Sequence, residues 1–120
     1  MKKTMKSILI VALLLLGLGS LQAQTAKAEF KVYGNCGMCE ARIEKAAESI
    51  EGIESADWDK ETKMIDVKYD PAQVETLEIH KAIAKAGHDT EKVKTDDKTY
   101  DELPGCCRYD RKEDSKKEED

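Results

Sequence analysis

Two cysteines that lie three positions apart, Cys36 and Cys39, mark the point where the periodicity of this chain changes. Before them, residues 29–33 alternate between polar and apolar side chains, as a strand with one buried face does. After them, apolar side chains recur every three or four positions over residues 39–50, as on one face of a helix. The chain therefore passes from strand to helix through a short loop, and this junction holds both thiols.

The start of a helix is a distinctive chemical environment for a thiol. Its free N–H groups and the positive end of its dipole favour thiolate, which is the form that binds metal or attacks a disulfide. Cys36 and Cys39 are therefore expected to be reactive. Three interpretations are open at this point: ligands of a metal ion, a redox pair, and a structural or oxidised pair.

The rest of the chain adds strands and a second helix in a regular order. Residues 53–69 predict a β-hairpin, because apolar side chains alternate on either side of a polar turn. Residues 79–86 have helical spacing and end at Gly87, and residues 88–95 predict a weaker, polar strand. The order strand, helix, strand, strand, helix, strand is that of the α+β ferredoxin-like fold, βαββαβ, with both helices on one face of an antiparallel sheet.

In this fold the loop after the first strand and the loop before the last strand lie at the same end. His88 is therefore expected near Cys36 and Cys39, as an auxiliary ligand or a proton-sensitive neighbour. The alternative is a solvent-exposed loop residue without a role. His80, at the border of the apolar face of the second helix, is expected to be an ordinary boundary residue.

Three segments of the chain resemble the heavy-metal-associated domain, the small fold of copper chaperones, of N-terminal modules of copper-transporting ATPases and of the periplasmic mercury-binding protein. These segments are residues 31–46, the hairpin up to residue 70, and residues 83–89. The resemblance covers residues 29–95 and implies that Cys36 and Cys39 are the metal ligands. It also implies a partner that transports or accepts the metal.

One position departs from the family pattern. The family commonly has a methionine two positions before the first cysteine, where its thioether packs the loop, and this chain has Gly34 there. Met38, between the two cysteines, is the residue that we expect to substitute for it.

The chemistry of two thiolates narrows the choice of ion. Without hard ligands nearby, they suit Cu(I) or Hg(II), soft ions that accept two sulfurs in nearly linear geometry. Zn(II) prefers four ligands, so this pair alone would hold it weakly. An open site lets a partner's thiolate enter and leave with the ion, which favours transfer over storage. The predicted function is a Cu(I) carrier, or metallochaperone, with Hg(II) scavenging as the alternative; exposed sulfurs also permit a metal-bridged dimer.

The alternative from another class is a thiol-disulfide oxidoreductase. The order of elements disfavours it, because a hairpin follows the Cys36–Cys39 helix instead of the parallel crossover unit of thioredoxin-like proteins. The sequence shows no nucleophile with a general base, phosphate loop or paired carboxylates, so we predict a protein that is not an enzyme.

Residues 96–109 extend beyond the resemblance and carry a second cysteine pair, Cys106 and Cys107. Three of their side chains are expected to pack on the domain and bring this pair to its surface: Tyr100, Leu103 and Tyr109. Adjacent cysteines do not easily bond to each other, because their Cα separation of about 3.8 Å is below the usual disulfide range. Cys106 and Cys107 are therefore candidate auxiliary ligands of the first site, a separate acceptor site, or disulfide partners of the first pair, and a structural thiol pair is the plainer alternative.

The two ends of the chain predict an exported protein with a charged tail. Residues 1–23 resemble a cleavable signal peptide, because lysines precede an apolar run that is too short to span a membrane, and cleavage is expected after Ala23. An uncleaved anchor is the alternative. The protein would then reach the periplasm or be secreted, without a membrane contact after cleavage. Residues 24–28 form a short lead-in, and residues 110–120 predict a disordered tail of mixed charge.

The charge balance excludes some partners. The formal net charge is −5, and it becomes −8 without the signal peptide, which contains three lysines and no acidic residue. This sign argues against binding to nucleic acid or to an anionic membrane surface. Charged side chains on both predicted helices, including Arg42, are expected to form a solvated surface, with a docking face for a partner protein as the alternative.

Overall fold

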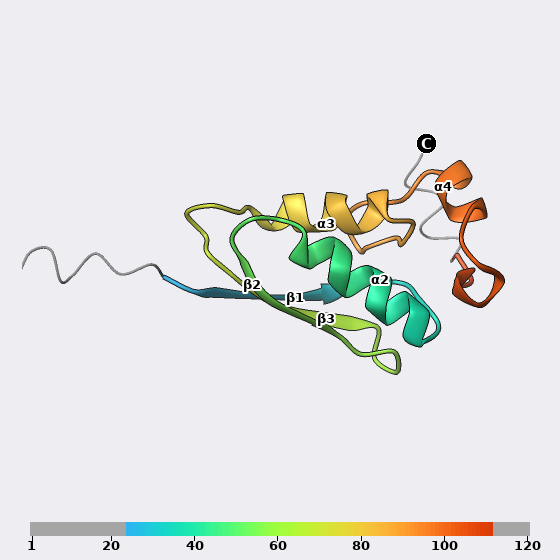
Figure 1. Ribbon diagram of the computed structural model, residues 1–120, viewed down its shortest axis with the longest axis horizontal. Helices are drawn as coiled ribbons and strands as arrows, with labels where there is room; N and C mark the ends of the chain where they lie inside the picture. Colours follow the sequence, from blue (N-terminus) through green and yellow to red (C-terminus); the bar gives the residue numbers. More distant parts are fainter. Residues whose placement is uncertain (1–23, 112–120) are drawn as a thin grey trace, which may run out of the picture.

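The computed structural model describes residues 24–111 of the chain (Figure 1). The predicted signal peptide and residues 112–120 of the predicted tail lie outside the described residues. The elements follow in the order β1 (Ala26–Lys31), α2 (Gly37–Glu48), β2 (Ile53–Trp58), β3 (Met64–Tyr69), α3 (Thr76–Lys85), α4 (Asp97–Asp101) and the 3-10 turn η1 (Gly105–Cys107). Between residues 24 and 111, no helix has the length and apolar character needed to cross a membrane.

The three strands form an antiparallel sheet with β3 in the centre, in the order β1, β3, β2. Ile65 on β3 pairs with Phe30 on one side and with Trp58 on the other, so these three buried side chains form a row across one face. Both α2 and α3 cover this face (Figure 1), and they bury Ile43 and Ile79 against it. This arrangement confirms the ferredoxin-like fold that the sequence predicts.

The boundaries differ from the prediction at the two edges of the domain. Strand β1 begins at Ala26, so most of the predicted lead-in belongs to the sheet. The predicted last strand is reduced to a single bridge between Val32 and Thr90. Here side chains bond the local backbone instead: the Thr90 hydroxyl accepts from the N–H of Val93 at 3.0 Å, and the Asp89 carboxylate accepts from the N–H of Thr95 at 2.9 Å. Such local bonds compete with a strand ladder.

The C-terminal extension docks on the domain, with η1 against α2 (Figure 1). Leu103 and Tyr109 are buried, and Tyr100 packs against the same core, as the sequence predicts. Leu103 lies over Gly87, whose φ of +113° and close approach leave no room for a side chain, since a Cβ there would be 2.8 Å from Leu103 Cδ2. The extension is therefore part of the folded core.

Candidate metal centre

The first cysteine pair lies at the N-terminus of α2. Cys36 is the N-cap residue, and Cys39 belongs to the first turn. Their Sγ atoms are 3.5 Å apart. Cys39 is buried and Cys36 is half-buried, and all four cysteines of the chain are free thiols. The strand-to-helix junction thus directs two sulfurs toward one point near the surface, as predicted.

The two thiols differ in their readiness to ionise. A hydrogen bond from the backbone N–H of Cys39 lowers the pKa of Cys36 to about 7. Burial raises the pKa of Cys39 to about 11. The helix start therefore favours thiolate at Cys36 only, because burial outweighs the helix at Cys39. Cys36 is therefore the more readily ionised thiol of the pair.

Trp58, which sequence analysis assigned only to a strand, packs against the loop at Gly34, where the resemblance implied a methionine. Gly34 is buried, and a Cβ there would be 3.0 Å from Trp58 Cη2 and 3.1 Å from Cys39 Cβ. The indole Nε1–H donates to the Val32 carbonyl at 3.0 Å, which fixes the ring. Met38 is 53 % exposed, so the expectation that it replaces the missing thioether in the core is wrong.

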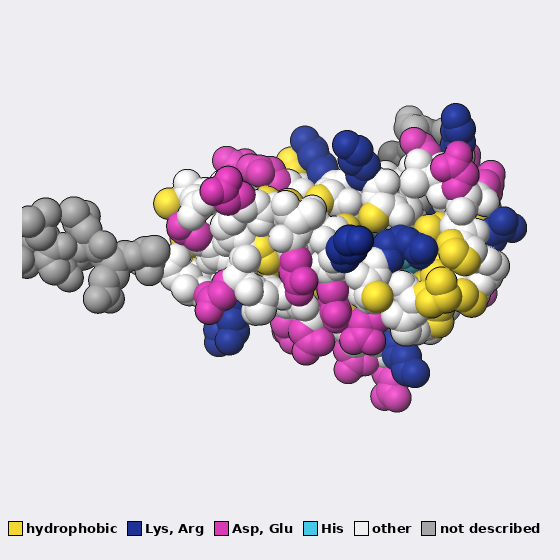
Figure 2. All heavy atoms as spheres, in the orientation of Figure 1, with side chains coloured by type: hydrophobic (Ala, Val, Ile, Leu, Met, Phe, Trp, Pro, Cys, Tyr) yellow, Lys and Arg dark blue, Asp and Glu magenta, His cyan; other side chains and the backbone are white. Residues whose placement is uncertain are grey.

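The structure brings the second cysteine pair to the first one. Cys107 Sγ is 3.8 Å from Cys36 Sγ and 3.9 Å from Cys106 Sγ, and the sulfurs of Cys36, Cys106 and Cys107 all lie within 4.8 Å of one another. Cys106 is exposed, and its Sγ contacts Met38 Sδ at 3.5 Å. Figure 2 shows hydrophobic side chains, a class that includes Cys and Met, gathered on the surface at the end of the molecule where η1 lies.

The structure therefore places both cysteines of the second pair next to Cys36, and the choice among the three predicted arrangements stays a prediction. The expectation that the whole second pair lies at the surface holds for Cys106 alone, because Cys107 is fully buried. Ligation of a metal by any of the four thiols stays a prediction.

Arg42 is a charged neighbour of this cluster that sequence analysis assigned to the solvated helix surface. Burial raises the pKa of the Cys107 thiol, and the Arg42 guanidinium beside it acts in the opposite direction. Within residues 24–111, Nη1 of Arg42 is buried and has no hydrogen-bond partner. The sequence did contain a signal for this position: Arg42 follows Cys39 by three residues, and residues i and i+3 lie on the same face of a helix.

His88 is fully buried, so the alternative of a solvent-exposed loop residue is wrong. Its Nδ1 lies 2.8 Å from the carbonyl oxygen of Tyr33, to which the neutral ring donates, and its ring stacks on Tyr109. Burial lowers the pKa of His88 to about 4. Among the described residues, Nε2 of His88 has no hydrogen-bond partner, and the groups of three or more clustered ligand atoms do not include this residue. Its role as an auxiliary ligand stays a prediction.

His80 is also buried and is not a boundary residue. Its Nδ1 lies 2.6 Å from the Thr90 hydroxyl, and its ring stacks on Phe30 with 3.8 Å between centroids. It therefore links α3 to the sheet.

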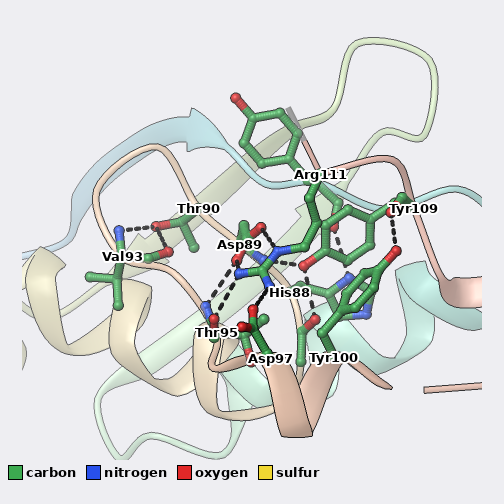
Figure 3. A network of polar contacts seen from close by, with 11 residues as sticks. His88, Asp89, Thr90, Val93, Thr95, Asp97, Tyr100, Tyr109 and Arg111 are labelled. Atoms are coloured by element: carbon green, nitrogen blue, oxygen red, sulfur yellow. Dashed lines mark hydrogen bonds and ion pairs between the residues drawn. The ribbon is translucent and has the colours of Figure 1, made fainter. Parts of the chain in front are cut away.

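A buried polar network holds the extension that carries Cys107 (Figure 3). Arg111 binds both carboxylate oxygens of Asp89, at 2.8 and 3.0 Å, and reaches Asp97 at 2.6 Å. The Tyr109 hydroxyl donates to the Gly87 carbonyl at 3.0 Å and accepts from the N–H of Asp89 at 2.8 Å. Arg111, which the sequence predicts to lie in the disordered tail, is therefore part of the folded domain.

Known proteins are similar to this chain in fold, and in sequence over the segment that contains Cys36 and Cys39. The model of the heavy-metal-associated domain matches residues 30–89, and this chain belongs to that family. The copper chaperone CopZ of Staphylococcus aureus is 34 % identical over 55 residues, which are 46 % of this chain and 81 % of CopZ. The family match ends before the segment that carries Cys106 and Cys107.

Two solved structures show the same architecture. The N-terminal domain of a potential copper-translocating P-type ATPase from Bacillus subtilis, in the Cu(I)-loaded state, has a TM-score of 0.53 and 32 % identity, covering 56 % of this chain and 85 % of that domain. Oxidized MerP from Ralstonia metallidurans CH34 has a TM-score of 0.54 and 29 % identity, covering 57 % of this chain and 96 % of MerP. The chain is thus similar both to copper proteins and to MerP.

Proposed function

We propose that this protein is an exported carrier of Cu(I), which binds the ion through Cys36 and Cys39 and passes it to a metal-transporting or metal-accepting protein. The observation that carries the proposal is the pair of free thiols, with Sγ atoms 3.5 Å apart at the start of α2. Two sulfurs without a hard ligand favour a soft ion such as Cu(I). The likeness to CopZ, which is named a copper chaperone, supports copper as the ion.

The unequal thiols suggest an order of events. Cys36, with a pKa of about 7, is the thiolate that binds the incoming ion, and the positive ion then drives loss of the proton from buried Cys39. On delivery, a partner's thiolate bonds to the ion while one bond to the carrier breaks, and the released sulfur takes up a proton. Each step exchanges one ligand, and copper keeps its oxidation state. Such a carrier is not an enzyme.

Competition titration tests the metal. Reduced, oxygen-free protein is titrated with Cu(I) against a chelator of known affinity, with Hg(II) and Zn(II) in parallel arms. We expect one Cu(I) to bind tightly, and Cys36→Ser to weaken Cu(I) binding by at least 100-fold. Tighter binding of Hg(II) than of Cu(I) would favour scavenging of Hg(II). Gel filtration of the loaded protein would reveal a metal-bridged dimer.

The alternative class is tested with the same preparation. A thiol-disulfide oxidoreductase would reduce a model disulfide repeatedly without metal, and Cys36→Ser would abolish that turnover. We expect no turnover above that of free dithiol. Turnover together with weak Cu(I) binding would contradict the carrier proposal.

Export rests on the pattern of residues 1–23 alone. We expect mass spectrometry of the protein from a periplasmic or secreted fraction to show a chain that begins at Gln24. A full-length chain in the membrane fraction would indicate an uncleaved anchor instead.

A further inference from the structure

We propose that Cys107 is a third ligand, so that the protein carries its ion in a closed site of three sulfurs, two from the start of α2 and one from the C-terminal extension. The inference rests on the proposed function, because it extends the site of Cys36 and Cys39. Cys107 lies outside the segment that matches the heavy-metal-associated domain, so this third ligand is a feature of this chain's own extension.

The spacing of the sulfurs supports more than two sulfur ligands. With metal–sulfur bonds of about 2.3 Å, neighbouring sulfurs lie about 4.0 Å apart around a three-coordinate ion and about 4.6 Å apart around a linear, two-coordinate ion. Cys36 Sγ is 3.5 Å from Cys39 Sγ and 3.8 Å from Cys107 Sγ. Both separations are shorter than the linear value, which favours a site with more than two sulfurs, and Cys36 is the sulfur that the two contacts share.

Burial separates Cys107 from its neighbour in the sequence. Cys39 and Cys107 are both fully buried, whereas Cys106 is exposed and contacts Met38 at the surface. An ion held between Cys36, Cys39 and Cys107 would be enclosed by protein on the side where a two-sulfur site is open. A partner's thiolate must then displace Cys107 to receive the ion, while the released Cys107 takes up a proton.

Arg42 supplies the charge that such a site requires. Three thiolates around Cu(I) carry a net charge of −2, and buried negative charge is costly without a cation or hydrogen-bond donors. The guanidinium of Arg42 lies beside Cys107, and its buried Nη1 has no acceptor within residues 24–111. A thiolate at Cys107 would provide this missing acceptor.

The extension also holds Cys107 in place before an ion arrives. Tyr109, two residues further along the chain, is fixed by two hydrogen bonds of its hydroxyl to the backbone of Gly87 and Asp89. Arg111 adds its ion pair with the buried Asp89. A ligand that is already positioned loses little conformational entropy on binding, which strengthens the site.

X-ray absorption at the copper edge counts the sulfurs directly. The chain from Gln24 to Asp120 is reduced, loaded with one equivalent of Cu(I), and compared with Cys107→Ser and with the matched neighbour variant Cys106→Ser. We expect three sulfurs in the unchanged chain, two in Cys107→Ser and three in Cys106→Ser. We also expect Cu(I) affinity to fall at least tenfold in Cys107→Ser, and less in Cys106→Ser.

The outcomes separate this inference from the proposed function. Two sulfurs in the unchanged chain would overturn the third ligand and leave the Cu(I) carrier intact, whereas failure to bind Cu(I) at all would overturn the carrier. Loss of a sulfur in Cys106→Ser alone, or four sulfurs in the unchanged chain, would also contradict the inference. The count in the unchanged chain does not depend on whether Cys107→Ser folds, and circular dichroism of each variant monitors its folding.

Discussion

Gly34 illustrates how one small residue determines the packing behind the metal loop. The Trp58 ring lies against Gly34 and would come within 3.0 Å of a Cβ added there. The tryptophan reaches this position from β2 and is held by its hydrogen bond to Val32. Gly34 and Trp58 therefore fit each other, and a larger residue at position 34 would collide with the Trp58 ring.

At this scale we predict that Gly34→Ala destabilises the protein by about 1–3 kcal/mol, because overpacking displaces the Trp58 ring or the Cys39 side chain. Gly37→Ala is the matched control, since a Cβ at Gly37 meets nothing within 4 Å. Urea unfolding followed by Trp58 fluorescence measures both. Equal free energies of unfolding for the two variants would show that the loop accommodates the added methyl group without loss of stability.

The elements of the fold were accessible to sequence reasoning to different degrees. Alternation and helical spacing located β1, α2, β2, β3 and α3, because each buries one face in a regular period. The prediction of a last strand at residues 88–95 was wrong, because the side chains of Asp89 and Thr90 bond the local backbone instead of leaving it to a strand ladder. Periodicity carries no information on such bonds.

The full site was only partly predictable for the same reason. Cys36 and Cys39 lie three positions apart at the start of one helix, so their spacing alone brought them together. The contact of Cys36 with Cys107 joins residues 71 positions apart and depends on how η1 docks. That docking rests on Tyr109 and on Arg111, which looked like part of a charged tail in the sequence.

At the scale of elements, we predict that Tyr109→Phe loosens the extension and costs about 1–3 kcal/mol of stability, because the buried N–H of Asp89 loses its acceptor. Tyr69→Phe is the control, since no hydrogen bond to the Tyr69 hydroxyl is found within the described part of the chain. Urea unfolding gives the stability, and alkylation of Cys107 in metal-free protein reports the loosening. Unchanged alkylation would mean that Arg111 and Leu103 hold the extension without this hydroxyl.

The folded domain as a whole contains two buried histidines, and both are held neutral. Burial lowers the pKa of His88 to about 4 and also lowers that of His80. In the unfolded chain both histidines take up protons below about pH 6.5. The unfolded state therefore binds more protons than the folded state between pH 6.5 and 4, and stability must fall as the pH falls through this window.

We predict that His88 accounts for about 3 kcal/mol of this loss in metal-free protein between pH 7 and pH 4. His88→Asn is the informative variant, because its amide preserves a donor to the Tyr33 carbonyl and does not titrate. Urea unfolding at several pH values should show a shallower decline for the variant than for the unchanged protein. Parallel declines would assign acid sensitivity to the carboxylates instead.

The contact between Cys36 and Cys107 has a mechanical consequence for the loaded protein. These residues lie near the beginning and the end of the folded chain, 71 positions apart, so one ion bound to both would cross-link the domain into a single large ring. A cross-link of this kind restricts the unfolded chain and resists fraying from the C-terminal end. Metal-loaded protein would then resist heat and proteases better than metal-free protein. Release of the ion would leave the extension attached by its non-covalent contacts alone.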